Sequence, residues 1–320
     1  MVERATLLPS PPDDVQGRRP RTHLSLSRVG VTGVEKIVRM GARGHDELFY
    51  ARLDCFVDLN PKQKGAHMSR FEETVNEAID EVVLGESFRA ETLAARYPER
   101  KHSPATGIPT QEIFTLLGSA VASETGVRRL VGVQAQGMTA CPCAQELIRD
   151  RSRERLAADG FSDDEIERVF EHVPAATHNQ RGLGTLHVGS PQAGEARIEA
   201  STLLRIVEAS MSSEVYELMK RPDEAEVVER AHSRPRFVED CVRESLRLAV
   251  EEFARLGDAA FVMARQENLE TIHRHDVVAE RHGLLGEVRR ELTADEPSTR
   301  HVTMREWLNA GDLKPSATRD

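Results

Sequence analysis

The order in which strand-like and helix-like segments follow one another is the feature of this sequence that most restricts its fold. Segments rich in Val, Ile and aromatic residues with strand-type alternation come in groups, and helical segments lie between the groups. Strict alternation would indicate a parallel α/β sheet, whereas grouped strands indicate an antiparallel sheet with helices packed on one face. The sequence therefore predicts an α+β protein, and its 320 residues are enough for a large core.

Each element is expected within definite limits. Strands are expected at residues 24–40, 46–60, 128–143, 181–190 and 259–271, the last being the final strand. Helices are expected at residues 69–85, 109–126, 144–160, 161–174, 193–212 and 235–257, with a turn at 220–224. Ser69 with Glu72, and Ser162 with Glu165, have the spacing of helix capping boxes. Residues 1–23 are expected to be a flexible tail, 24–308 one domain with a helical insert at 144–177, and 309–320 a polar tail.

Composition excludes several classes of protein. The net charge of −10, with no basic stretch that contains interleaved aromatic residues, argues against nucleic acid as the main ligand. There is no run of 18 apolar residues for a membrane span, and the N-terminus has no apolar core of a secretory signal. Four cysteines in such a chain indicate free thiols in a reducing compartment, so a cytoplasmic location is expected.

The stretch MTACPCAQE (138–146) places Cys141 and Cys143 on either side of a proline, at the end of an expected strand. If the strand continues this far, both thiols lie on one face, where they could form part of a metal site. The spacing differs from the CxxC of a zinc knuckle and no second pair exists, so a four-cysteine structural zinc site is not expected. From spacing alone, two buried structural thiols are an equally good interpretation. Cys55 and Cys241, in a strand and a long helix, are expected to be buried structural thiols.

Other side chains that can bind a metal or move a proton stand in short polar motifs. These are His67 in KGAHMSR, His178 in ATHNQRG, Asp223 and Glu224 in KRPDE, Glu239 and Asp240 in FVEDC, and His273 and His275 in LETIHRHD. A single histidine of this kind is usually structural, and His67 is interpreted in that way. A thiolate, imidazole and carboxylate set with one position left for water suits a catalytic zinc, iron(II) or manganese(II) site.

Six motifs together carry a family resemblance. KGAHMSRFEE, MTACPCAQE, THNQRG, LMKRPDE, RFVEDCVR and ETIHRHD occur in the order seen in the type IB GTP cyclohydrolase family, from about residue 24 to 283. That family includes bacterial folate enzymes and archaeal MptA-type enzymes of methanopterin synthesis. The resemblance implies the tunnelling fold, with two ββαα-type halves per chain joined between subunits into an antiparallel barrel. It also implies GTP as substrate and a homotetramer with active sites at subunit interfaces.

The resemblance also implies roles for individual residues. At least one of Cys141 and Cys143 would bind one divalent metal per subunit, with His178 as a ligand and Glu224 as a further ligand or near-ligand. Glu239 would anchor the guanine, since its two acceptor oxygens can face the N–H and amino donors of the base. His273 or His275 would act as general acid and base. Arg181, Lys64 and Arg70 would contact the triphosphate. Asn179 or Gln180 would orient His178 or the substrate. Each of the three basic residues, taken singly, also fits a solvated surface charge.

The 34 residues between Cys143 and His178 decide which branch the chain resembles. They carry two expected helices, and a helical insert at this place is similar to the archaeal MptA-type branch, which favours Fe(II), with Mn(II) or Zn(II) as alternatives. The implied reaction converts GTP to 7,8-dihydroneopterin 2′,3′-cyclic phosphate with release of formate and pyrophosphate, as the first step of tetrahydromethanopterin or folate-type pterin synthesis. The alternatives are a bacterial-type enzyme that yields 7,8-dihydroneopterin triphosphate, or a purine- or pterin-binding tunnelling-fold protein without cyclohydrolase activity.

Overall fold

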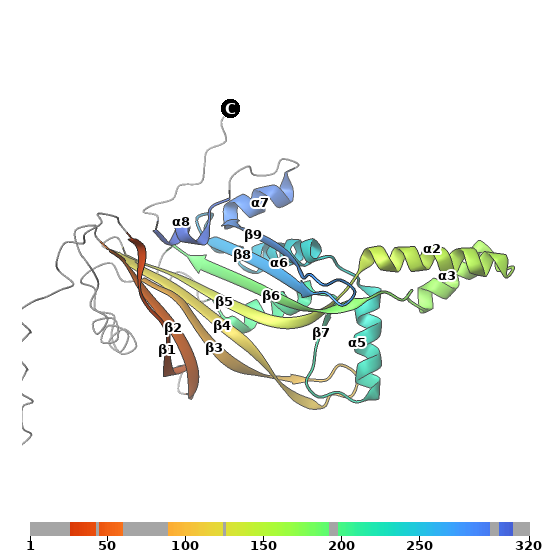
Figure 1. The fold of residues 1–320 in the computed structure, drawn as a ribbon, viewed down its shortest axis with the longest axis horizontal. Helices are drawn as coiled ribbons and strands as arrows, with labels where there is room; N and C mark the ends of the chain where they lie inside the picture. The colour runs from red at the N-terminus through yellow and green to blue at the C-terminus, as the bar shows by residue number, and fades with distance from the viewer. Residues whose placement is uncertain are drawn as a thin grey trace, which may run out of the picture.

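The computed structural model describes residues 26–42, 45–59, 89–123, 126–191, 198–294 and 301–309. Its strands form one antiparallel sheet in the order β1-β2-β3-β4-β5-β6-β8-β9, with the short β7 paired to β5 (Figure 1). The strands are β1 (Leu26–Ala42), β2 (His45–Leu59), β3 (Arg89–His102), β4 (Pro109–Ser123), β5 (Gly126–Ala140), β6 (Asn179–Ser190), β7 (Ser213–Glu214), β8 (Phe261–Leu269) and β9 (Val277–Leu284). The helices are α2 (Pro142–Ala158), α3 (Asp163–His172), α4 (Ala200–Ser210), α5 (Arg221–Ser233), α6 (Val238–Glu252), α7 (Leu285–Thr293) and α8 (Met304–Asn309).

This architecture confirms the predicted α+β class. In the second half of the chain, β5 and β6 are followed by α4 and α6, which pack on the sheet, and then by β8 and β9. In the first half, β1 and β2 likewise precede β3 and β4 in the same sheet. This succession of strand pairs is that of the tunnelling fold. The joining of subunits into a barrel stays a prediction.

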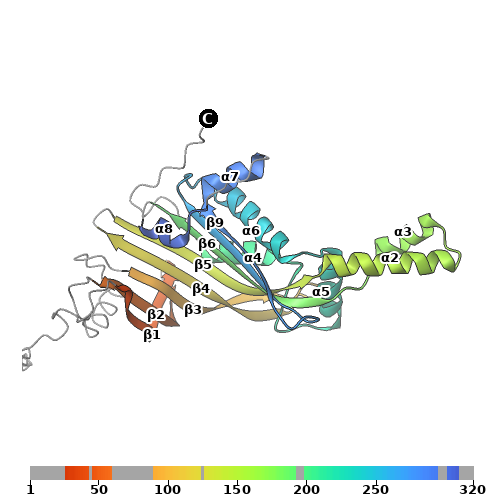
Figure 2. The ribbon, with the colours of Figure 1, turned by 45° about the horizontal axis from the view of Figure 1, so that its top comes forward.

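The sheet has two faces with different covers. A side chain at Gly184 in β6 would meet Val207 of α4, whereas one at Gly189 would meet Trp307 of α8. Because side chains alternate along a strand, positions five apart point to opposite faces. The helices α4 and α6 therefore cover one face, called here the helix face (Figure 2), and α8 covers part of the opposite face. The main core lies under α4 and α6, with Leu186, Val188 and Leu203 fully buried.

The second core shows that the prediction of helices on one face only was incomplete. Trp307 of α8 is fully buried against Leu130 and Phe261. Its indole nitrogen donates a hydrogen bond of 2.8 Å to the carbonyl of Ala259, and Arg128 donates one of 2.7 Å to the carbonyl of Trp307. These contacts hold a short helix that the sequence pattern did not reveal.

Several predicted elements differ from the structure. The helix predicted at 109–126 is wrong, because residues 109–123 form β4, which pairs with β3 from Pro109 to Val121 and with β5 from Thr115 to Ser123. β4 contributes Phe114 to the main core and Val121 to the second core, which lie on opposite faces of the sheet, while Ile113 is 62% exposed, so its buried residues do not follow one simple alternation. The turn predicted at 220–224 is wrong, since α5 begins there, and β9 follows the strand predicted to be last. β3, α7 and α8 were not predicted. The helix predicted at 69–85, both predicted tails except Asn309, and the side chain of Cys55 lie outside what the structure describes.

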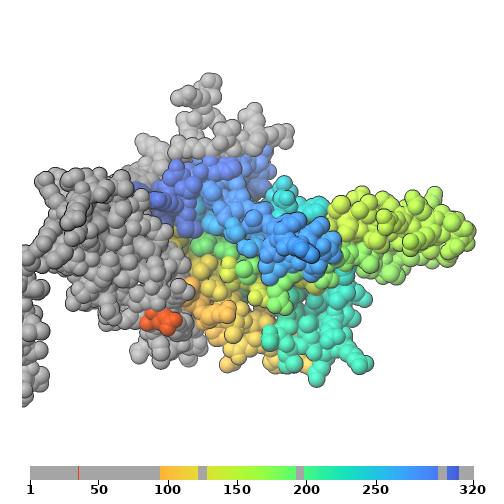
Figure 3. Space-filling model, viewed as in Figure 1, coloured from red at the N-terminus to blue at the C-terminus, as the bar shows by residue number. Residues whose placement is uncertain are grey.

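The two helices predicted between Cys143 and His178 are confirmed as α2 and α3, and so is the capping box of Ser162 and Glu165. Together they form a helical arm that extends beyond the end of the sheet (Figures 1 and 3). No residue of α2 is buried, and only Ile166 of α3 is. Within the described residues, no helix is both long and apolar enough to span a membrane.

Candidate active site

Most of the chemically interesting motifs meet at one end of the sheet. Ala140, the last residue of β5, pairs with Asn179, the first of β6, and β8 ends beside the start of β6. The Cys-Pro-Cys element, the HNQR motif and the segment after β8 therefore all lie at this end of the strands, which is called the edge of the sheet from here on. This arrangement follows from the antiparallel pairing and does not require the three motifs to be close in sequence.

Cys141 and His178 are direct neighbours across the strand pair. The Cys141 N–H donates a hydrogen bond of 3.1 Å to the His178 carbonyl, and the Thr177 hydroxyl donates one of 2.7 Å to the Cys141 carbonyl. Residues paired in this way have Cβ atoms about 5 Å apart on one face. The thiol and the imidazole, 37 positions apart in the sequence, are thus brought together by the backbone. Cys141 is partly buried, whereas Cys143, in the first turn of α2, is exposed.

A buried carboxylate stands beside this pair. Glu270 follows β8, its side chain is only 6% exposed, and its Oε2 lies 3.8 Å from His178 Nδ1. Its other oxygen accepts a hydrogen bond of 3.3 Å from the Gln180 amide. Glu270 stands in the ETIHRHD motif, but it was not among the predicted site residues. A pattern in the sequence could have indicated it. Gln266, Asn268 and Glu270 stand at every second position along and after β8, so their side chains share one face and lead toward the site.

The loop from Glu270 to Asp276 carries the two predicted acid–base histidines. The rings of His273 and His275 stack with centroids 5.1 Å apart, and both side chains are exposed. The Glu270 N–H donates to the Asp276 carboxylate at 3.2 Å, and the Thr271 hydroxyl donates to the Asn179 carbonyl at 3.1 Å. These bonds hold the loop against the start of β6, next to His178.

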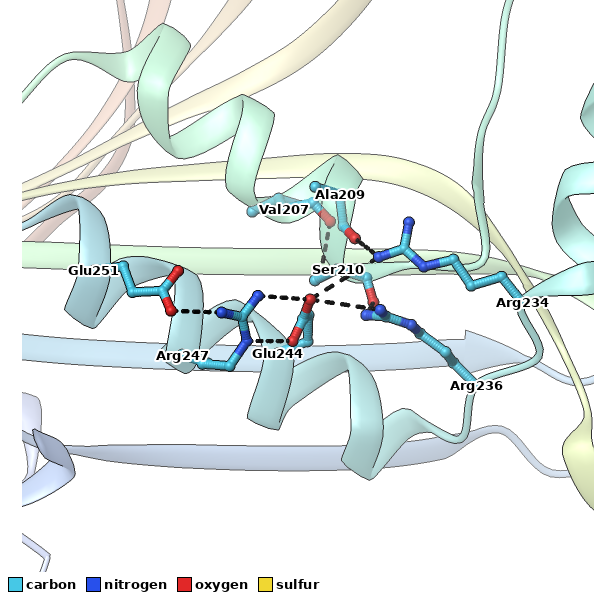
Figure 4. A network of polar contacts seen from close by, with 8 residues as sticks. All are labelled: Val207, Ala209, Ser210, Arg234, Arg236, Glu244, Arg247 and Glu251. Carbon is cyan, nitrogen blue, oxygen red and sulfur yellow. Dashed lines mark hydrogen bonds and ion pairs between the residues drawn. The ribbon is translucent and has the colours of Figure 1, made fainter. Parts of the chain in front are cut away.

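The start of α6 reaches the same edge of the sheet. The Arg236 N–H donates a hydrogen bond of 2.9 Å to the carbonyl of Ala140, the residue before Cys141. The guanidinium of Arg236 donates to the Ser210 carbonyl at the end of α4 at 2.7 Å and pairs with Glu244 of α6 at 3.5 Å (Figure 4). Glu239, in the first turn of α6, is therefore held near the Cys-Pro-Cys element, with its own side chain exposed.

Glu224 is not brought to this edge within one chain. Its neighbour Asp223 is fully buried and accepts hydrogen bonds from the Ala105, Thr106 and Lys220 N–H groups and from the Thr106 hydroxyl, at 2.6–2.9 Å. Burial by itself raises the pKa of Asp223, but these hydrogen bonds outweigh it and hold the pKa well below its usual range. They fix the start of α5 to the β3–β4 turn.

The other end of α5 is the one near the site, because the Gln145 amide donates to the His232 carbonyl at 2.6 Å and to the Ala175 carbonyl at 3.1 Å. Glu224 is eight residues before His232, about 12 Å along the helix.

The remaining predicted residues lie elsewhere. Arg181 is exposed and adjacent to the buried Gln180 in β6, so it points to the opposite face from Gln180 and His178. Lys64, Arg70 and His67 lie outside the described residues. Cys241 is buried in α6, as predicted, and burial raises the pKa of its thiol to about 12.

The donor chemistry of the edge suits a divalent metal, but the described residues supply only part of a ligand set. In the described part of the chain, no three His, Cys, Asp or Glu side chains are grouped closely enough to hold an ion. Four buried polar atoms at this edge have no hydrogen-bond partner among the described residues: Thr139 Oγ1, His178 Nδ1, Gln180 Oε1 and Glu270 Oε2. Buried polar groups are seldom left unpaired unless a ligand, ion or water uses them. A thiol, an imidazole and a buried carboxylate thus form a polar centre at the end of the antiparallel sheet.

Comparison with known proteins identifies the class. Residues 13–279 match the family model described as type I GTP cyclohydrolase folE2. The chain is 39% identical to "GTP cyclohydrolase MptA" of Methanococcus aeolicus over 87% of this chain and 99% of that protein. It is also 39% identical to "GTP cyclohydrolase MptA" of Methanocaldococcus jannaschii over 88% of this chain and 98% of that one. The chain therefore belongs to the type I GTP cyclohydrolase family, as the motifs predicted, and is an enzyme of that class.

Among solved structures, the chain is similar to uricase from Arthrobacter globiformis, with 9% identity and a TM-score of 0.42 over 82% of this chain and 95% of that one.

Proposed function

We propose that this GTP cyclohydrolase depends on a divalent metal and forms 7,8-dihydroneopterin 2′,3′-cyclic phosphate, with release of formate and pyrophosphate. The observation that carries the proposal is the pairing of Cys141 with His178 beside the buried Glu270. The helical arm and the similarity to MptA proteins of methanogens favour the cyclic phosphate over the triphosphate. The product would enter methanopterin or folate-type pterin synthesis.

The metal would be held by His178 and by one or both of Cys141 and Cys143, with Fe(II) favoured over Mn(II) and Zn(II). When bound, it would activate water for attack on C8 of the guanine ring. Glu270 would accept a hydrogen bond from the Nδ1–H of His178, which leaves the other ring nitrogen to act as a ligand. Glu224 is too far from His178 in one chain to complete the set, so a role for it requires assembly into the proposed homotetramer, with sites between subunits.

The other residues of this edge would handle substrate and protons. Glu239 would bind the guanine through its N1–H and amino group, since an exposed carboxylate at the start of α6 offers two acceptors to two donors. His273 and His275 lie on the loop held beside His178, and either imidazole would transfer protons during ring opening and formate release. Arg181 lies on the opposite face of the sheet from His178, so contact with the triphosphate would also require a neighbouring subunit.

The test is anaerobic turnover of GTP by metal-stripped protein resupplied with Fe(II), Mn(II) or Zn(II). Formate is quantified, and the mass of the pterin is determined before and after phosphatase treatment. Formate with a phosphatase-resistant cyclic phosphate is the expected result. Formate with a triphosphate would overturn the branch assignment, and absence of formate with every metal would overturn the proposed function. Cys141→Ser and Cys143→Ser variants, compared for bound metal, show which thiol is the ligand.

A further inference from the structure

Three buried polar side chains form a row across three adjacent strands, just inside the edge that carries Cys141 and His178. Thr139 of β5 pairs with Gln180 of β6, and Glu270 follows Leu269, the β8 partner of Arg181. Thr139 is fully buried and Gln180 is 5% exposed. This polar row lies on the helix face, because a side chain at Gly182, two residues from Gln180, would meet Gln266 and Met211.

The polar row contains one internal hydrogen bond and three unpaired atoms. The Gln180 Nε2 donates to Glu270 Oε1 at 3.3 Å. Among the described residues, Thr139 Oγ1, Gln180 Oε1 and Glu270 Oε2 have no hydrogen-bond partner. Leaving a buried polar atom unpaired is unfavourable, and several such atoms together point to a functional requirement. The one bond that is made fixes the Glu270 carboxylate, which has no other side-chain donor in the described structure.

We propose that Gln180 is a positioning residue, which holds the Glu270 carboxylate so that its second oxygen faces His178. Gln180 binds Oε1, and Oε2 is then directed toward His178 Nδ1 at 3.8 Å. A carboxylate in this position sets the orientation and basicity of an imidazole that binds a metal. This inference rests on the proposed function, since it assigns Gln180 a role in the same metal site.

Asn179 does not fit this role, although the sequence left it as an alternative to Gln180. Side chains of consecutive strand residues point to opposite faces, so Asn179 points away from the polar row. Its backbone carbonyl is used by the Thr271 hydroxyl, which fastens the loop after β8. Asn179 thus contributes to the site through its main chain, whereas Gln180 contributes through its amide.

The Gln180→Met substitution tests the amide donor of Gln180 apart from its volume, because it keeps the length of the side chain but removes the donor. It is expected to lower the affinity of the metal-free protein for Mn(II), and kcat with it, by about 10- to 100-fold. The KM for GTP is expected to stay within about twofold, because the proposed guanine anchor Glu239 is untouched.

Gln266→Met is the matched control. Gln266 is 1% exposed in β8 and donates to Asn268 Oδ1 at 3.0 Å, so the same change removes an equally buried amide donor on the same face. The control is expected to bind Mn(II) and turn over GTP as the wild type does. The thermal midpoint of each variant separates loss of positioning from loss of folding.

Mn(II) affinity is measured by calorimetric titration, which does not depend on turnover. In a Glu270→Gln background, Gln180→Met is expected to cost less than about threefold further, because residues that act through one another are not additive. Wild-type Mn(II) affinity in Gln180→Met, an equal loss in Gln266→Met, or fully additive losses in the double variant would each overturn the inference. If the wild type itself neither binds metal nor releases formate, the proposed function fails, and the inference with it.

Discussion

His187 should make folding of this protein measurably sensitive to mild acid. It lies in β6 on the face opposite α4, packed over Gly132 and buried, with its Nδ1 unpaired among the described residues. Burial lowers the pKa of His187 from 6.5 to about 4, although the nearby Glu280 acts in the opposite direction. The folded protein therefore keeps the ring neutral under conditions in which the unfolded chain would protonate it.

The direction and size of the effect follow from this difference. Between pH 6.5 and about 4 the unfolded state binds more protons than the folded state, so the free energy of unfolding falls as pH falls. The contribution of His187 is complete above pH 6.5 and lost progressively below it, by about 2 kcal/mol between pH 7 and pH 5. For a domain of this size, that corresponds to a decrease in Tm of roughly 4–8 °C.

The assay compares slopes of stability against pH, since carboxylates also contribute to acid lability. His187→Gln removes the titrating group and should flatten the slope between pH 7 and pH 5, whatever its effect on absolute stability at pH 7. His172→Gln, at an exposed position of α3, should leave the slope unchanged. Identical slopes for wild type and His187→Gln would refute the assignment of the shifted pKa to burial of this ring.

Three further predictions concern other parts of the molecule. Trp307→Ala should lower the free energy of unfolding by about 3–5 kcal/mol in urea titrations, because it empties the second core and leaves the Ala259 carbonyl unpaired; a loss below 1 kcal/mol would contradict this packing. Brief alkylation of the native protein at pH 8, followed by peptide mass analysis, should label the exposed Cys143 and spare Cys241, whose pKa is raised to about 12 by burial; labelling of both would show that α6 opens readily. Glu239→Ala should raise the KM for GTP by about 30-fold or more, the effect of losing a charged hydrogen-bond partner worth at least about 2 kcal/mol. An unchanged KM would place the guanine elsewhere.

Much of the site could be predicted because its residues stand in short motifs. A motif is recognised from its residues and their spacing, even where the predicted secondary structure is wrong. Cys141, His178, His273 and His275 were selected from the sequence, and the structure brings them to one edge. The register that makes Cys141 and His178 neighbours could not be predicted, since it depends on pairing across the arm. Glu270 was not selected because its role depends on its distance from His178, although the alternation of Gln266, Asn268 and Glu270 could have indicated it.

The two main errors in the predicted fold have different physical causes. Residues 109–126 have apolar residues at spacings that fit a helix, but pairing with β3 and β5 overrides that local preference. The start of α5 contains Pro222, which suggests a turn in sequence but is also favourable in the first turn of a helix. The pairing of β4 depends on neighbouring strands, which a local pattern cannot show, whereas the start of α5 fits two local structures, and the sequence alone does not choose between them.

The way the helical arm joins the sheet allows the outer part of the arm to change without changing the candidate active site. Hydrogen bonds at its base, from Cys141 to His178 and from Thr177 to Cys141, close the loop before α2 and α3 extend outward. The entropy of closing a loop grows only slowly with its length, so shortening the arm beyond the first turn of α2, which carries Cys143 and Gln145, or inserting another domain there, should leave Cys141 and His178 in register. The outer part of the arm can therefore be replaced by another structure, in evolution or by design, without changing the residues at the candidate active site.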